Sequence, residues 1–177
     1  YRQQDDTFIS LLNNIREGKT TATDLQRLNE RYNPAFQPKN GSDYIRLTTH
    51  NRMAESYNEE QLRNLPTKAY TFSAETDGNF PEYNYPTDFN LTLKVGAQVM
   101  FIRNDNNGRY YNGRIGHITH VDNKKIAVLC PGDEEEFEVE IETWENTKYT
   151  LNEKTKQIEA EVQGTFKQYP LRLAWAI

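Results

Sequence analysis

The sequence changes character near residue 91, and this change limits the folds that the chain can adopt. Before it, apolar residues recur at helical spacing, which predicts helices over 5–16 and 23–32 and a third helix that begins near Asn51. After it, short alternating apolar and polar runs, separated by turn residues, continue to about residue 162. We therefore expect an α/β part joined to an all-β part.

Two short strands and a connector complete the α/β part. Alternating apolar residues predict strands over 44–48 and 68–74. The stretch 75–90 contains two prolines, a glycine and several Asp and Asn residues, which predicts a connector. Asn51 is predicted to cap the third helix, because an Asn side chain can accept a hydrogen bond from a free N–H group of the first turn.

The all-β part is predicted to be a small barrel. Pairs such as Asn112-Gly113 and Asp122-Asn123 mark its turns. About seventy residues with five or six short strands are typical of a closed barrel of the Src-homology-three or oligonucleotide-binding kind. The strands are expected over 93–103, 113–121, 125–130, 136–142, 148–151 and 158–162.

The sequence ends on an apolar run from Tyr169 to Ile177 that resembles the strands of an α/β domain. A buried strand of this kind needs neighbours on both sides to satisfy its backbone groups. A β module inserted into an α/β domain explains this order of segments. Because nothing follows the run and Tyr1 leads directly into a helix, we also expect the chain to be an excised piece of a larger protein.

Composition indicates a soluble globular chain, and its charge leaves the partner open. No stretch approaches the length of a membrane span, and a single cysteine, Cys130, fits a reducing compartment, most simply the cytoplasm. The net charge of −5 disfavours a nucleic-acid partner, yet residues 94–125 carry six basic side chains against two acidic ones. Such a face is compatible with DNA, and a solvated surface of chance charges explains it equally well.

Spacing excludes the familiar catalytic and metal motifs. Gly18-Lys19-Thr20-Thr21 resembles the end of a phosphate-binding loop, but the earlier glycine of that motif is missing and a helix precedes it. His117 and His120 would lie on opposite faces of a strand, and the chain has too few His and Cys residues for a metal site. The sequence therefore predicts no metal site and no self-sufficient active site.

Three segments together resemble the second motor domain of the Pif/RecD branch of superfamily-one DNA helicases. They are Tyr1–Asp5, Ile45–Asn51 with Ala54 and Asn58, and Pro170–Ile177. Gly96–Met100 and Asn112-Gly113 resemble the barrel inserted in that domain. The resemblance implies a partial RecA-like motor domain over 1–91 and 163–177, with a Src-homology-three-like barrel inserted over 92–162.

The resemblance also implies a function and a nucleotide site. The parent protein would be an ATP-dependent DNA helicase that couples ATP hydrolysis to translocation on single-stranded DNA and to duplex unwinding. Arg2 would be the catalytic residue that reaches the γ-phosphate, and Tyr1 would approach the adenine. The other interpretation of Arg2 is an ion pair with Asp5 or Asp6 at the helix start.

The DNA-binding residues implied by the resemblance fall in two places. Hydroxyl, amide and backbone N–H groups at a helix N-terminus suit phosphates, although the same side chains can simply cap the helix. On the barrel, arginines beside Tyr110 and Tyr111 have the composition of single-strand binders, with at most one of these tyrosines facing outward. The implied residues are Thr48, Thr49, His50 and Asn51 at the helix, and Arg103, Arg109 and Arg114 on the barrel.

The implied cofactors are ATP and magnesium, bound mainly by parts of the parent outside this chain. The implied partners are single-stranded DNA and the first motor domain of the same protein, with no membrane. The chain alone is expected to be inactive, because it lacks the Walker motifs. The alternative function is a non-catalytic nucleic-acid or protein binding module built on the small barrel.

Overall fold

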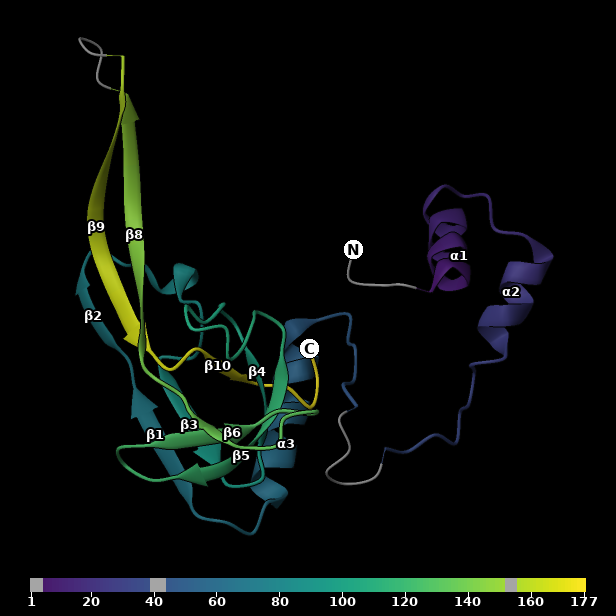
Figure 1. Ribbon diagram of the computed structural model, residues 1–177, viewed down its shortest axis with the longest axis horizontal. Coiled ribbons are helices and arrows are strands. Elements are labelled where there is room, and N and C mark those ends of the chain that lie inside the picture. The colour runs from purple at the N-terminus through teal and green to yellow at the C-terminus, as the bar shows by residue number, and fades with distance from the viewer. Residues whose placement is uncertain (1–4, 39–43, 152–155) are drawn as a thin grey trace. The chain divides into compact units, whose positions relative to one another are not determined.

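The computed structural model describes residues 5–38, 44–151 and 156–177. The chain divides into two compact units, Tyr1–Lys39 and Asn40–Ile177, whose helices and strands are labelled in Figure 1. Tyr1 and Arg2, the residues predicted to bind the nucleotide, lie outside the described residues.

The first unit consists of helices α1 (Asp6–Arg16) and α2 (Ala22–Asn29), which confirms the two helices predicted at the start of the chain. Asp5 caps α1 by accepting a hydrogen bond from the backbone N–H of Phe8 at 3.0 Å. Thr21 and Asp24 form a reciprocal capping box at the start of α2. The side-chain amide of Asn14 donates to Asp24 at 3.1 Å, so the same carboxylate also ties α1 to α2.

The second unit begins with an extended segment and helix α3 (Asn51–Asn64), followed by strand β1 (Ala69–Ser73). The helix and β1 confirm the predictions, but the predicted strand over 44–48 is wrong in extent. Only Arg46 forms a β-bridge there, parallel to Ala176. The predicted connector contains β2 (Glu75–Gly78) and a short 3-10 helix (Glu82–Asn84), which its polar composition concealed.

The strand predicted over 93–103 is two strands. Gly96, at a φ of +88°, lies in the turn between β3 (Asn90–Lys94) and β4 (Gln98–Phe101). Strand β3 pairs with β1, whereas β4 belongs to a five-stranded antiparallel sheet in the order β10-β4-β5-β6-β7. Its other strands are β5 (Ile115–Val121), β6 (Ile126–Leu129), β7 (Phe137–Glu138) and β10 (Leu171–Leu173).

The five-stranded sheet is open. Among the described residues its end strands β10 and β7 pair with no further strand, so the sheets do not close and the barrel is not confirmed. The mixed α/β class is confirmed. One hydrophobic core joins β3 with this sheet, and its fully buried side chains include Leu93, Phe101, Ile126, Val128 and Leu171. The apolar C-terminal run contributes only the short β10, which pairs with β4.

A third sheet contains the two longest strands of the molecule's described part. Strands β8 (Glu142–Leu151) and β9 (Ile158–Gln168) form a long antiparallel pair, and β2 covers only the lower half of β9 (Figure 1). The sequence predicted only the ends of these strands, because polar residues interrupt the alternation at 142–147. No described helix is long and apolar enough to cross a membrane.

Candidate nucleic-acid interface

A short backbone ladder fixes the segment that precedes α3. The N–H of Arg46 donates to the carbonyl of Trp175 at 2.9 Å, and the N–H of Ile177 donates to the carbonyl of Arg46 at 3.0 Å. The N–H and hydroxyl of Thr48 both donate to the carbonyl of Ile177, at 2.8 and 3.2 Å. Residues 46–48 are therefore held by the C-terminal residues rather than by a sheet of their own.

The N-terminus of α3 has no side-chain cap. His50 occupies the cap position with extended backbone angles, and Asn51 is already the first helical residue, so the prediction that Asn51 caps the helix is wrong. The hydroxyl of Thr48 donates to the carbonyl of His50 at 3.1 Å, and the Thr49 hydroxyl lies 2.9 Å from Nδ1 of His50. The first-turn N–H groups of α3 are left without a side-chain acceptor, which favours an anion there.

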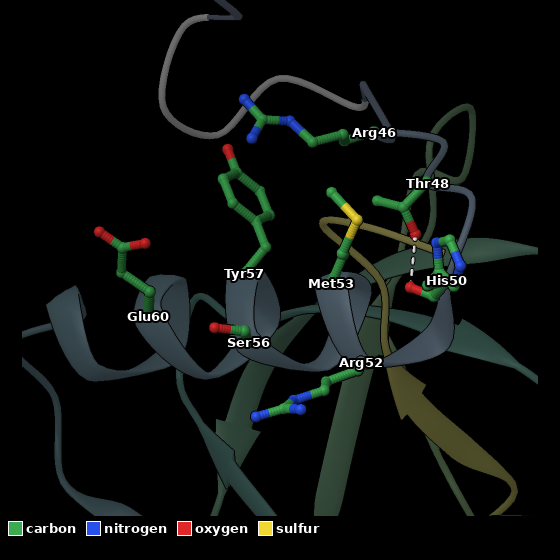
Figure 2. A pocket seen from close by; sticks show the side chains of 8 residues that line it. All are labelled: Arg46, Thr48, His50, Arg52, Met53, Ser56, Tyr57 and Glu60. Atoms are coloured by element: carbon green, nitrogen blue, oxygen red, sulfur yellow. Dashed lines mark hydrogen bonds between the residues drawn. The ribbon is translucent and has the colours of Figure 1, made fainter.

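Thr48 and His50 border a pocket of about 570 Å³ (Figure 2), whereas Thr49 and Asn51 do not line it. The guanidinium carbon of Arg46 lies 4.1 Å from the centroid of the Tyr57 ring, and the exposed Met53 lies between that ring and Thr48. Arg52 extends from the opposite side of α3. The lining residues are Arg46, Thr48, His50, Arg52, Met53, Ser56, Tyr57 and Glu60.

The pocket combines positive charge with an apolar and aromatic wall. Within the described parts of the chain, neither Arg46 nor Arg52 forms an ion pair. A planar guanidinium suits a phosphate, and an aromatic ring suits a base, so the site has the chemistry that single-stranded nucleic acid requires. The sequence prediction missed Arg46, Arg52, Met53 and Tyr57. The spacing of Arg46 from Thr48, two residues apart on an extended segment, was the signal for Arg46.

Arg109, predicted to contact DNA, is bound within the chain. Its Nε and Nη2 donate to the two carboxylate oxygens of Asp105 at 2.9 and 3.0 Å, and Nη1 donates to the carbonyl of Glu138 at 3.2 Å. The hydrogen bond to Asp105 raises the pKa of Arg109, and the hydrogen bond from Arg109 lowers the pKa of Asp105. This fork fixes the loop between β4 and β5.

The other two arginines of the predicted barrel surface are also engaged. Arg114 donates to the Asp133 carboxylate at 2.5 Å and to the carbonyl of Arg109. Arg103 donates to the carbonyl of Thr143 at 2.6 Å, lies 3.4 Å from the Glu142 carboxylate and stacks over Trp144. All three thus have structural partners, and no described bond joins them to residues 46–51. Their contact with DNA stays a prediction.

The two adjacent tyrosines separate as expected. Tyr110 is 2% exposed and stacks on Phe101 with ring centroids 4.0 Å apart, whereas Tyr111 is 60% exposed. Burial raises the pKa of Tyr110 to about 12. Only Tyr111 can therefore offer an aromatic face to a ligand.

The described residues contain no candidate metal centre. No group of three or more His, Cys, Asp or Glu side chains converges there. His120 instead lies 3.1 Å from the Asp122 carboxylate. The hydrogen bond from the N–H of Lys124 lowers the pKa of Asp122 most, and the contact with His120 lowers it further. A magnesium ion has no described site in this part of the protein.

Comparison with known proteins finds helicases along the whole chain. No family model matches. The human ATP-dependent DNA helicase PIF1 is 31% identical over 192 residues, which cover 100% of this chain and 27% of that protein. Pif1 from Bacteroides sp. in complex with ADP-AlF4 superposes with a TM-score of 0.88 at 34% identity, over 100% of this chain and 40% of that one.

A second Bacteroides Pif1 structure, bound to single-stranded DNA, matches all of this chain and 40% of its own with a TM-score of 0.70 at 35% identity. The chain thus spans between about a quarter and two fifths of the length of these relatives. The matches do not favour the alternative of a non-catalytic binding module.

Proposed function

Because the chain belongs to the Pif1-like superfamily-one helicases, we propose that it is part of an ATP-dependent DNA helicase that translocates on single-stranded DNA and unwinds duplexes. The observation that supports this most is the similarity over the full chain, in sequence to human PIF1 and in structure to Bacteroides Pif1. Within that activity, the described part of the chain is proposed to contribute a contact with the DNA strand.

The phosphate contact is proposed at the N-terminus of α3. Thr48, Thr49, His50 and Asn51 lie at or just before the uncapped start of α3, and Thr48 and His50 line the pocket together with Arg46 and Arg52. Backbone N–H groups and hydroxyls bind phosphate without regard to the base, which suits an enzyme that must move along any sequence. The two arginines add long-range attraction and account for binding despite the net charge of −5.

A base contact is proposed at the wall of the same pocket. Met53 and the Tyr57 ring lie beside Thr48, where the phosphate contact is proposed, and the Arg46 guanidinium stacks on that ring. Stacking of a base on such a surface is sequence-tolerant, because every base has a flat face. Arg103, Arg109 and Arg114 are proposed as a secondary DNA surface, which would contact DNA in addition to their present partners within the chain.

The nucleotide would be bound between this chain and the first motor domain. Arg2 is proposed to reach the γ-phosphate and Tyr1 the adenine, with ATP and magnesium held mainly by residues outside the chain. We also propose that 1–91 and 163–177 belong to a RecA-like motor domain and that 92–162 form an inserted barrel of the Src-homology-three kind. The antiparallel run β4-β5-β6-β7 supports that insertion.

The DNA contact is tested by the affinity of the full-length protein for a fluorescent single-stranded oligonucleotide. Arg46→Ala should weaken binding by about five- to tenfold and lower the salt dependence by about one phosphate contact. Arg63→Ala is the matched control, because Arg63 lies in the last turn of α3 and does not line the pocket. Equal affinities for the two variants would exclude the pocket from DNA binding.

A further inference from the structure

The pocket is lined by the segment with Arg46 and Thr48 and by helix α3, and a buried amide connects these two parts. Asn58 lies on α3, is 8% exposed and does not line the pocket. Its Nδ2 donates to the carbonyls of Leu173 and Ala176 at 3.2 and 2.9 Å, and its Oδ1 accepts from the N–H of Ala176 at 2.8 Å. One side chain therefore satisfies three backbone groups of the C-terminal segment.

A second buried amide holds the same segment from the other side. Gln98 on β4 is fully buried, and its Nε2 donates to the carbonyls of Ala174 and Tyr44 at 2.9 and 3.2 Å. Its backbone carbonyl accepts from the N–H of Ala174 at 2.9 Å. Gln98 thus links the C-terminal segment directly to the start of the segment that carries Arg46 and Thr48.

These bonds form a continuous path from α3 to Arg46 and Thr48, which line the pocket. Asn58 holds Ala176, residues 175 and 177 hold Arg46 and Thr48 through the parallel ladder, and Thr48 reaches back to His50 at the start of α3. The described backbone hydrogen bonds of Arg46 and Thr48 lie in this ladder. The backbone position of Arg46 and Thr48 relative to α3 is consequently set by the C-terminal segment.

We infer that Asn58 and Gln98 are positioning residues of the DNA pocket, which hold Leu173–Ile177 as the template on which residues 44–48 are placed. This inference rests on the proposed function of the pocket. Neither side chain would touch DNA. Removing Asn58 leaves buried backbone groups without partners, so the C-terminal segment and the ladder attached to it shift away from α3.

A matched control exists elsewhere in the same unit. Gln168 is 2% exposed, and its Nε2 donates to the carbonyls of Phe72 and Phe89 at 2.8 and 3.2 Å while its Oε1 accepts from the N–H of Tyr169 at 2.9 Å. It has the same chemistry and burial as Asn58, and none of these partners lines the pocket. Loss of the Gln168 amide should therefore lower the free energy of unfolding without moving Arg46 and Thr48.

The experiment compares Asn58→Ala with Gln168→Ala in the full-length protein. Urea unfolding measures the stability of each variant, and anisotropy of a labelled oligonucleotide measures affinity and its salt dependence. Asn58→Ala should weaken binding about tenfold and reduce the salt slope by about one, whereas Gln168→Ala should leave both within about twofold of the wild type.

Gln98→Met is made in parallel and carries the test if Asn58→Ala does not fold. It conserves volume and removes only the two donated hydrogen bonds, since Oε1 of Gln98 has no partner among the described residues. If the wild type binds DNA and both Asn58→Ala and Gln98→Met bind as tightly as Gln168→Ala, the positioning role is excluded. If the wild type itself does not bind, the proposed function fails and this inference fails with it.

Discussion

The Asp105 carboxylate accepts three hydrogen bonds from Arg109, one from its backbone N–H and two from its guanidinium. The sequence alone suggested a free arginine for DNA, because nothing in the spacing shows that the two side chains meet in a fork. A bidentate pair of this kind is stronger than a single exposed ion pair. Arg109 is thus first a residue of the loop between β4 and β5.

Asp105→Asn should destabilise the protein by about 2 kcal/mol at pH 7, because the half-buried guanidinium of Arg109 loses its charged partner. The hydrogen bonds from Arg109 hold the pKa of Asp105 below its ordinary value of 3.8. The stabilisation is therefore present above pH 4 and is lost as the pH falls through the lowered pKa. Urea unfolding at pH 7 and pH 3 measures both effects.

The control for this prediction is Asp77→Asn, since Asp77 is exposed on β2. It should change the free energy of unfolding by less than about 0.5 kcal/mol. A loss for Asp105→Asn that equals the control, or that persists unchanged at pH 3, would contradict the role given to the fork.

Cys130 is expected to be inert in the folded protein. It is buried, and burial raises its pKa to about 11, so about one thiol in a thousand is ionised at pH 8. A thiol reagent should react at least about a hundredfold more slowly with the native protein than with the protein in urea. As Cys130 is the chain's single cysteine, a fast native reaction would show directly that this part of the core is open.

At the scale of elements, the close approach of β2 and β9 depends on a glycine. A Cβ atom on Gly164 would lie 2.6 Å from backbone atoms of Asn79, so alanine does not fit without moving the strand. Gly164→Ala should lower the free energy of unfolding by about 2 kcal/mol or more. Thermal or urea unfolding measures the loss.

Gly132→Ala is the control for Gly164→Ala, because it introduces backbone strain without a steric clash. Gly132 has a φ of +90° and open space around its Cβ position, so alanine there should cost only about 1 kcal/mol. If the two variants were equally stable, the contact between β2 and β9 would not be as close as described.

The elements that depend on local periodicity were predictable, and those that depend on distant partners were not. Helices α1 to α3 follow their apolar spacing, α1 and α2 also have side-chain caps, and β5 and β6 follow alternation between clear turns. Strand β8 exists because β9 pairs with it along its whole length, although its own sequence is polar. Residues 44–48 look like a strand but find only one bridge partner.

The candidate site shows the same division. Thr48 and His50 were predicted from the resemblance, and the structure places them at one pocket. Tyr57 belongs to the site only because Arg46, eleven positions earlier, folds back over its ring. No periodicity within α3 indicates that contact, so the surface proposed to stack a base could not be predicted from the sequence.

At the scale of the whole molecule, the two units carry different parts of the proposed activity. The pocket lies within the second unit, whereas the residues proposed to reach the nucleotide are at the start of the first. Composition could not reveal this division, because no catalytic motif is complete in the chain. The similarity to Pif1 helicases covers the whole of this chain, and it is the observation that relates the two units to one activity.

We propose that the full-length protein is a DNA-stimulated ATP motor, and its rate of ATP hydrolysis decides whether it is. The wild type should hydrolyse ATP slowly alone and at least about tenfold faster with single-stranded DNA. Arg2→Ala should lower the stimulated rate about a thousandfold or more while DNA binding persists, because an arginine on the transferring phosphoryl group stabilises its transition state. Absence of ATP hydrolysis by the wild type, with or without DNA, would overturn the assignment as a motor.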